Sequence, residues 1–161
     1  MALIDDLRSL NMMKIDGFLE VPDIAGPSQR DGHEDQIEIY DVTFSMVAPF
    51  DPNSLSRKGR VSLGTVTCTK DVDMSSPYLA KACHENKPLD EVVIYCRRTI
   101  DGATSDYFVV TLKEASVVGY SFGASKTNPD TLGDIVQFAY KNIELKYDDD
   151  HTTDMDVATG M

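Results

Sequence analysis

The spacing of apolar residues predicts a chain built mainly from β-strands. Apolar positions alternate with polar ones, or run together as in a strand buried on both faces, over 12–18, 36–47, 60–70, 89–98, 107–120 and 132–147. Several of these runs exceed the usual strand of about six residues. The apolar phase flips between Ile39 and Tyr40, and a second flip divides 132–147. Such flips are typical of a β-bulge or of a bend that carries a strand from one sheet to the next.

One segment, 75–86, has the spacing of an amphipathic helix instead. Leu79, Ala82 and Cys83 follow the helical i, i+3, i+4 pattern and share a face, so we expect this face to pack on the sheet. The segment also carries signals for both helix ends: Ser76 to cap the first turn with its hydroxyl, Pro77 at the first helical position, and Asn86 and Pro88 as stop signals.

These elements predict a mainly β fold, a small antiparallel β barrel made of two bent sheets with one flanking α-helix. Long strands that turn a corner in the middle are how a sheet closes on itself. Asp101-Gly102 marks a turn between two strands, in a loop that we expect to exceed two residues. The predicted domains are an N-terminal arm over 1–11, a single β-barrel domain over 12–147, and an acidic tail over 148–161. The tail has no periodicity, which predicts disorder.

Charge and composition exclude several classes of function. The net charge of −12 over 161 residues disfavours nucleic acid as a partner, because phosphate binding needs clustered lysine and arginine. No apolar run is long enough to span a membrane, and the start of the chain lacks the basic and apolar regions of a signal peptide. We therefore expect synthesis in the cytoplasm. Cys68, Cys83 and Cys96 lack metal-site spacing, which predicts buried reduced thiols.

Two short motifs resemble functional sites, and neither predicts a catalytic, cofactor or metal site. Ser121 lies in a GxSxG pattern, with Asp130 or Asp134 and His151 following in hydrolase order. The sequence after Gly123 cannot open the helix that a nucleophile elbow needs, so we expect no enzyme activity. His33, Glu34 and Asp35 are adjacent on a loop and do not converge on one metal ion, so we expect solvated charge.

The loop over 48–59 is the longest connection between two strong strands, and long ordered loops tend to be functional. It carries apolar residues among polar neighbours and two rare positive charges. Apolar residues on such a loop either fold back on their own barrel or reach a neighbouring subunit. The predicted contact residues are Phe50, Asp51, Asn53, Leu55, Arg57 and Lys58.

The order of several phrases resembles one known family. The phrases are KIDG (14–17), HEDQIEI (33–39), TCTKDVDMSSPYLAKAC (67–83), VVIYCRR (92–98), VTLKEASVVGYSFG (110–123) and VQFAYKNIELKY (136–147). Together they are similar to the haemolysin-coregulated protein (Hcp) family, the inner-tube subunit of the bacterial type VI secretion system. The phrase that includes Thr69, Asp71 and Ser75 to Pro77 is the most specific part, and the resemblance covers 12–147.

The resemblance implies a structural subunit and not an enzyme. Such subunits form hexameric rings that stack into a hollow tube, which a contracting sheath expels, and the rings carry or chaperone effectors in the lumen. The implied partners are other copies of the chain and the sheath, spike and effector proteins, with no cofactor, no nucleic acid and no membrane insertion. The implied location is the bacterial cytoplasm, followed by secretion through the type VI apparatus without a signal peptide.

Two other functions compete with this interpretation. A monomeric barrel could hold a small ligand in its interior. Large side chains at the predicted core positions, such as Phe44, Tyr95, Phe108 and Phe138, disfavour an open interior. A small hydrolase that uses Ser121 is the other alternative, and it lacks the required structural context.

Overall fold

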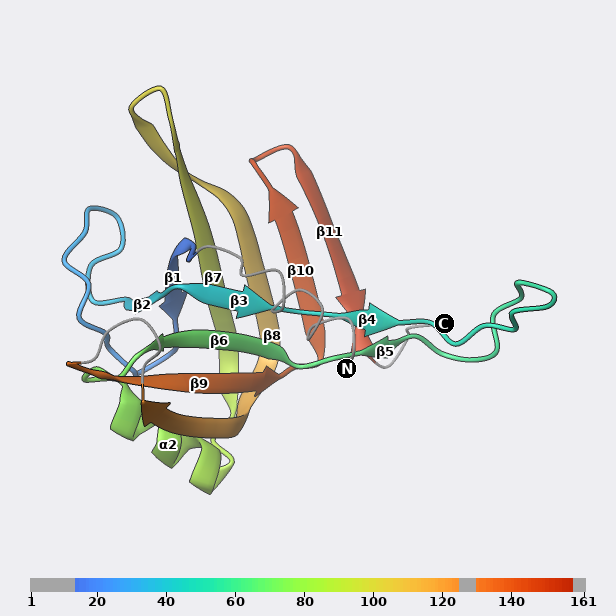
Figure 1. The fold of residues 1–161 in the computed structure, drawn as a ribbon, viewed down its shortest axis with the longest axis horizontal. Helices are drawn as coiled ribbons and strands as arrows, with labels where there is room; N and C mark the ends of the chain where they lie inside the picture. The colour runs from blue at the N-terminus through green and yellow to red at the C-terminus, as the bar shows by residue number, and fades with distance from the viewer. Residues whose placement is uncertain (1–13, 125–129, 158–161) are drawn as a thin grey trace.

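The structure is a computed structural model that describes residues 14–124 and 130–157. Within these residues the chain forms one helix, α2, and a series of strands (Figure 1). In chain order the elements are β1 (Asp16–Glu20), β2 (Ile37–Ile39), β3 (Asp41–Thr43), β4 (Met46–Val47), β5 (Ser62–Leu63), β6 (Val66–Asp71), α2 (Ser76–Glu85), β7 (Leu89–Ile100), β8 (Ala103–Ala124), β9 (Leu132–Ala139), β10 (Asn142–Tyr147) and β11 (His151–Asp156). The predicted N-terminal arm lies outside the described residues.

The main sheet is antiparallel and curls back on itself. Its strand order is β2-β1-β7-β8-β9-β6-β3, and the two end strands follow one another in the chain through Tyr40. The Tyr40 N–H donates to the Thr69 carbonyl at 3.0 Å, and the Tyr40 carbonyl accepts from Ile15 N–H at 2.9 Å. The chain therefore passes from one edge of the sheet to the other at the predicted phase flip. The mainly β, barrel-like fold with one flanking helix is confirmed.

The second phase flip divides what the sequence predicts as one strand over 132–147. β9 ends at Ala139 and pairs with β6 and β8, whereas β10 begins at Asn142 and pairs with β8 and β11. The long β8 makes this possible, because its first half pairs with β10 and its second half with β9. A register shift between Val117 and Gly119 marks the bend, as a β-bulge would.

Three local predictions are wrong or shifted. The first strand, predicted over 12–18, is observed at Asp16–Glu20. Residues 12 and 13 of that prediction are not among the described residues. The turn at Asp101-Gly102 has two residues and no more, because Ile100 pairs directly with Ala103. Both turn residues have positive φ, at 51° and 80°, which is the mirror-image turn that matches strand twist.

The tail is the third correction, because residues 151–156 form a strand and not a disordered segment. β11 pairs with β10 over six residues, from Tyr147↔His151 to Asn142↔Asp156. Most β11 side chains are exposed, so the sequence of this strand has no alternation of apolar and polar residues that would predict it. Backbone pairing holds this strand in place, together with hydrogen bonds from the Asn142 amide to Asp154 and Asp156.

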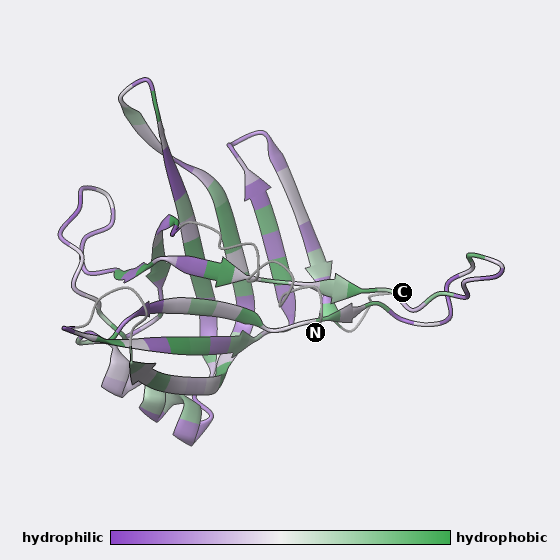
Figure 2. Ribbon diagram, viewed as in Figure 1, coloured by the Kyte–Doolittle hydropathy of each residue, from purple (hydrophilic) through white to green (hydrophobic). Residues whose placement is uncertain are grey.

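The core and the helix follow the sequence pattern. Apolar side chains from the curled sheet and from α2 form one cluster, and hydrophobic and hydrophilic residues alternate along the strands (Figure 2). Leu79 and Ala82 bury the helix face against this cluster, while Cys83 is half-buried. Asn86 ends the helix in the left-handed region at φ 52°, as predicted. None of the helices in the described part of the chain is long and apolar enough to cross a membrane.

Candidate functional site

The most prominent surface feature is a projecting loop, residues 48–61, between β4 and β5. It extends well beyond the body of the molecule at one end of the long axis (Figure 1). Its stem is a two-stranded sheet with Met46 opposite Leu63 and Val47 opposite Ser62. The loop is therefore an arm with its own short ladder, separate from the main sheet.

Hydrogen bonds attach the base of the arm to the barrel. The Gly64 N–H donates to the Ser45 carbonyl at 2.9 Å, and the Tyr140 hydroxyl donates to the Gly64 carbonyl at 2.7 Å. A Cβ on Gly64 would lie 3.0 Å from the same Ser45 oxygen, so this close backbone approach favours glycine. The direction of the arm is thus set by β4, β5 and the end of β9.

The arm has a defined internal conformation. Phe50 and Arg57 form an isolated antiparallel bridge, and the Lys58 N–H donates to the Pro49 carbonyl at 2.8 Å. Asp51 organises the tip, because its carboxylate accepts the Asn53 N–H at 2.9 Å and its carbonyl accepts the Leu55 N–H at 2.7 Å. These contacts order the arm before any partner binds, which lowers the entropy cost of association.

The two apolar side chains of the arm point to solvent. Leu55 is 77% exposed and Phe50 is 58% exposed, so neither folds back on the barrel. The stem adds Met46 and Val47, which are also exposed. Apolar side chains gathered on a projecting segment are typical of an interaction surface. The structure brings all six sequence-predicted contact residues together on this arm, while their role in subunit contact stays a prediction.

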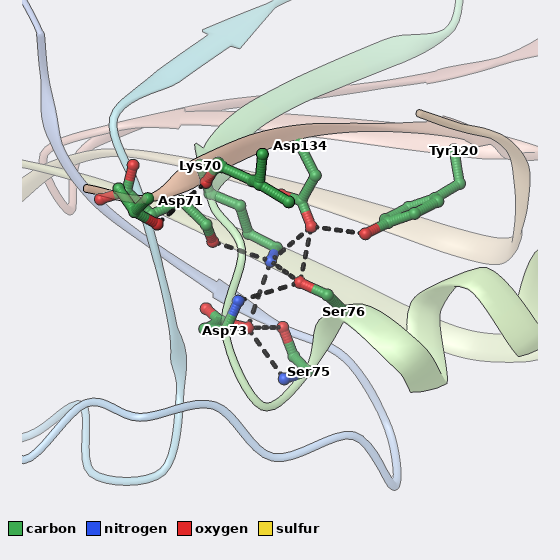
Figure 3. A network of polar contacts seen from close by, with 9 residues as sticks. Lys70, Asp71, Asp73, Ser75, Ser76, Tyr120 and Asp134 are labelled. Atoms are coloured by element: carbon green, nitrogen blue, oxygen red, sulfur yellow. Dashed lines mark hydrogen bonds and ion pairs between the residues drawn. The ribbon is translucent and has the colours of Figure 1, made fainter. Parts of the chain in front are cut away.

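A second constellation, which sequence analysis missed, is a buried polar network around Lys70. The side chain of Lys70 is fully buried at the end of β6, and the network joins it to α2, β8 and β9 (Figure 3). The ammonium donates to Asp134 Oδ2 at 3.0 Å, to Ser76 Oγ at 2.9 Å, and to Asp73 Oδ1 and the Asp71 carbonyl at 3.2 Å each. The ammonium has three N–H donors, so these four acceptors engage all of them.

The Asp134 carboxylate is the main acceptor of this network. Its Oδ2 accepts from Ser76 Oγ at 2.6 Å and from the Tyr120 hydroxyl at 2.8 Å, in addition to Lys70. Burial, followed by the hydrogen bond to Asp134, raises the pKa of Tyr120 to about 12. The hydroxyl therefore stays protonated and continues to donate over the whole range of ordinary pH.

This network corrects the prediction for the start of the helix. Ser76 does not cap the first turn with its hydroxyl, because that hydroxyl donates to Asp134 and accepts from Lys70 and from the Asp73 N–H. Ser75 occupies the capping position without a side-chain capping bond, so the helix begins at Ser76 and Pro77 is its second residue, one position later than predicted. The start of α2 is thus held by local contacts between Asp73 and the two serines together with the tertiary contact to Asp134.

A signal for the network was present in the sequence. Lys70 continues the inward phase of Val66 and Cys68 on β6, so its side chain has to enter the core. A lysine at such a position needs buried acceptors, and Asp73 and Ser76 follow within six residues. Asp134 is 64 residues away, and its contribution could not be read from local spacing.

The network does not form a catalytic centre. Although Ser76 Oγ lies 2.9 Å from the Lys70 ammonium, the serine is 4% exposed and the lysine is fully buried. A substrate cannot reach a hydroxyl that is enclosed in this way. The arrangement instead fastens α2 to three strands.

The sequence motifs tested for chemistry do not converge. Ser121 lies in the extended strand β8 opposite Ile135, and not on an elbow. His151 lies on β11 and aligns through Tyr147 with Phe108 of β8. Thirteen residues of strand separate that register position from Ser121, roughly 40 Å along the chain. The described residues contain no group of three or more side chains suited to a metal ion.

His33 corrects a further prediction. Glu34 and Asp35 are exposed as expected, whereas His33 is only 4% exposed. Its ring stacks on Phe18, with ring centroids 4.3 Å apart and an interplanar angle of 3°. The histidine is therefore a buried polar group with specific partners and not a solvated charge.

Comparison with solved structures shows that this fold is shared with proteins named Hcp1. The fold resembles Hcp1 from Escherichia coli EAEC 042, with a TM-score of 0.77 and 22% identity over 91% of this chain and 99% of that one. It also resembles Hcp1 from Salmonella typhimurium, with a TM-score of 0.75 and 20% identity over 93% and 99% of the two chains. At these identities the likeness establishes the fold.

The sequence matches the profile of the family described as "Type VI secretion system effector, Hcp" over residues 13–147, so the chain belongs to the Hcp family. Two relatives come from Pseudomonas aeruginosa. "Protein hcp1" is 25% identical over 137 residues, 84% of each chain. "Major exported protein" is 29% identical over 96 residues, which span 60% of this chain and 56% of the relative.

Proposed function

We propose that the chain is the structural subunit of a type VI secretion inner tube. In this proposal six copies close into a ring, rings stack into a hollow tube, and the lumen carries effector proteins. The tube interacts with the sheath and spike of the apparatus. The subunit is made in the bacterial cytoplasm and exported through the apparatus itself. Family membership supports a role in type VI secretion, and the name of the "Major exported protein" relative supports export.

The observation that carries the proposal is the ordered, projecting arm over 48–61. Closed rings need heterologous contacts, in which one patch of a subunit meets a different patch of the next. An arm that extends from one end of the molecule supplies one such patch (Figure 1). Phe50 and Leu55 would provide the desolvated centre of this contact. Arg57 and Lys58 would set orientation against an acidic neighbour, since the chain carries a net charge of −12.

A second feature, the edge strand β11, also supports assembly. Within the described residues β11 pairs only with β10, so its other side presents backbone donors and acceptors. Edge strands of this kind pair readily with another chain. A ligand-binding barrel is less well supported, because large side chains from the sheet and the helix pack together in its interior.

Assembly is tested by size-exclusion chromatography with light scattering, followed by electron microscopy of the purified full chain. We expect a species of six subunits and ring-shaped particles. A strictly monomeric protein at high concentration would refute the tube proposal.

The contact role of the arm is tested by replacing residues 49–58 with a short Gly/Ser linker. The barrel should keep its melting temperature, because the exposed arm packs little apolar surface, whereas rings or stacks should weaken. A double substitution, Phe50→Ser with Leu55→Ser, tests the two apolar side chains alone. Tyr78→Ser is the matched control, because Tyr78 is 60% exposed on α2. Intact rings and tubes in both arm variants would remove these residues from the contact.

A further inference from the structure

A buried histidine connects the surface segment 21–36 to the outer face of the sheet. The segment is held together by its own backbone hydrogen bonds, including Gly26 N–H to Asp35 O and Asp35 N–H to Ser28 O, both at 2.8 Å. It packs closely on β2, since a Cβ on Gly26 would lie 2.5 Å from Ile37 Cα. The side chain of His33, 5% exposed, reaches from this segment toward β8.

Both ring nitrogens of His33 face hydrogen-bond acceptors. Nδ1 lies 2.7 Å from Gln36 Oε1, and Nε2 lies 3.1 Å from both carboxylate oxygens of Asp106. The amide of Gln36 is held in this orientation because its Nε2 donates to Glu20 Oε2 at 2.8 Å. A neutral imidazole carries one N–H and can satisfy one of these acceptors, whereas an imidazolium carries two and satisfies both.

The surroundings of the ring also favour a positive charge. The ring stacks on the face of Phe18, where a cation gains electrostatically. Asp106 is shared with Arg97, whose Nε lies 3.2 Å from the carboxylate. Arg30 is neutralised by Asp16 through two contacts of 2.6 and 2.8 Å. The ionisable groups around His33 and its partners are Asp16, Glu20, Glu38, Arg30, Tyr95, Arg97 and Asp106.

Carboxylates therefore outnumber guanidinium groups in this cluster by four to two, so a proton on the imidazole offsets part of the excess. Arg30 and Arg97 both lie over the Phe18 ring, at 5.1 and 5.6 Å, and oppose the imidazolium. Arg30 is paired with Asp16, which weakens its opposition, whereas Arg97 shares the Asp106 carboxylate with His33. The hydrogen-bond geometry and the local charge thus point to the same protonation state.

We propose that His33 is a pH-responsive latch whose doubly protonated ring fastens segment 21–36 to the sheet, and that loss of one ring proton loosens the segment. The deprotonated ring would no longer donate to both Gln36 and Asp106, so one of the two contacts that join the ring to its neighbours would be lost. The segment supplies Pro27 and Arg30 to a surface cavity of about 240 Å³ that is also lined by β1 and β2. The latch therefore controls whether one wall of this cavity stays in place.

The test is amide hydrogen exchange of the full chain at about pH 5.5 and about pH 8. Rates are corrected for intrinsic exchange, and the assembly state is checked by light scattering at both values. Protection in 21–36 should fall at least about tenfold at the higher pH, which corresponds to about 1.4 kcal/mol. The arm over 48–61 is the internal control, because it contains no histidine and should show no change.

Three variants identify the group responsible. In Asp106→Asn the new amide can donate to Nε2, so a neutral ring satisfies both partners and the pH response should disappear while the segment stays protected. His33→Gln should also abolish the response. A double variant of the exposed histidines, His84→Gln with His151→Gln, should keep it.

Direct evidence comes from ¹⁵N spectra of the imidazole rings in this double variant, where His33 is the only histidine left. Both ring nitrogens should be protonated at about pH 5.5. Equal protection of segment 21–36 at the two pH values in the native chain would overturn the latch. A neutral ring at about pH 5.5, or a pH response that persists in His33→Gln or in Asp106→Asn, would overturn it as well.

Discussion

Replacing Lys70 with methionine should strongly destabilise the fold. The substitution keeps an unbranched side chain of similar length and removes the ammonium that donates to Asp134, Ser76 and Asp73. It leaves the buried carboxylate of Asp134 without a cation. Because that carboxylate is fully enclosed, water cannot replace the lost donor.

The contacts that survive set the expected magnitude. Removing one partner of a buried ion pair costs about 3–5 kcal/mol. Asp134 Oδ2 keeps donors from Ser76 and Tyr120, and Asp73 Oδ1 keeps two from Ser75. Because these bonds remain, we expect a loss of unfolding free energy of about 3 kcal/mol, at the lower end of that range. For a chain of this size the loss corresponds to a fall in melting temperature of roughly 6–12 °C.

The assay is urea unfolding followed by circular dichroism, at one protein concentration so that assembly affects all variants equally. Lys81→Met is the matched control, because Lys81 forms an exposed ion pair with Glu85 at 3.8 Å. Exposed pairs of this kind contribute less than about 1 kcal/mol. Adding Asp134→Asn to the buried substitution should recover part of the loss, because it removes the unpaired charge.

One result would refute this reasoning. If Lys70→Met and Lys81→Met change the unfolding free energy by the same small amount, the buried network does not hold α2 to the sheet. Full additivity of Lys70→Met and Asp134→Asn would likewise show that the two side chains are not coupled.

Three further predictions concern single side chains. Leu79→Asp places a charge on the buried helix face and should cost several kcal/mol in thermal melting, whereas Lys81→Asp on the exposed face should cost little; equal melting temperatures would mean a wrong helix register. Ser121→Ala should not change stability or assembly, and loss of fluorophosphonate labelling in that variant would reveal a nucleophile after all. Burial, and then the Asp106 carboxylate, raises the pKa of the Cys96 thiol from 9.0 to about 11, so its contribution to stability is complete below pH 9.0 and is lost as the pH rises toward 11. Urea unfolding at these two values should show this loss, and Cys96→Ala should show a smaller one; an equal loss would exclude the thiol as its source.

The sequence alone determined the elements that depend on local pattern. The helix position and its end at Asn86 followed from i, i+3, i+4 spacing and a left-handed stop residue. The phase flip at Tyr40 predicted a bend between sheets, because side chains on a strand change face only where the pleat is interrupted. The projecting arm was found from its length and its isolated apolar residues, Phe50 and Leu55, which the structure places in solvent.

The tertiary structure alone decided everything that depends on partners distant in sequence. β11 forms because β10 offers a backbone edge, which no side-chain pattern in the acidic tail reveals. His33 is buried because Phe18 and Asp106 meet it from other strands. The hydroxyl of Ser76 at the start of α2 donates to Asp134, which is 58 residues away in the sequence. Local spacing records the period of an element, whereas these contacts arise only when the curled sheet brings distant strands together.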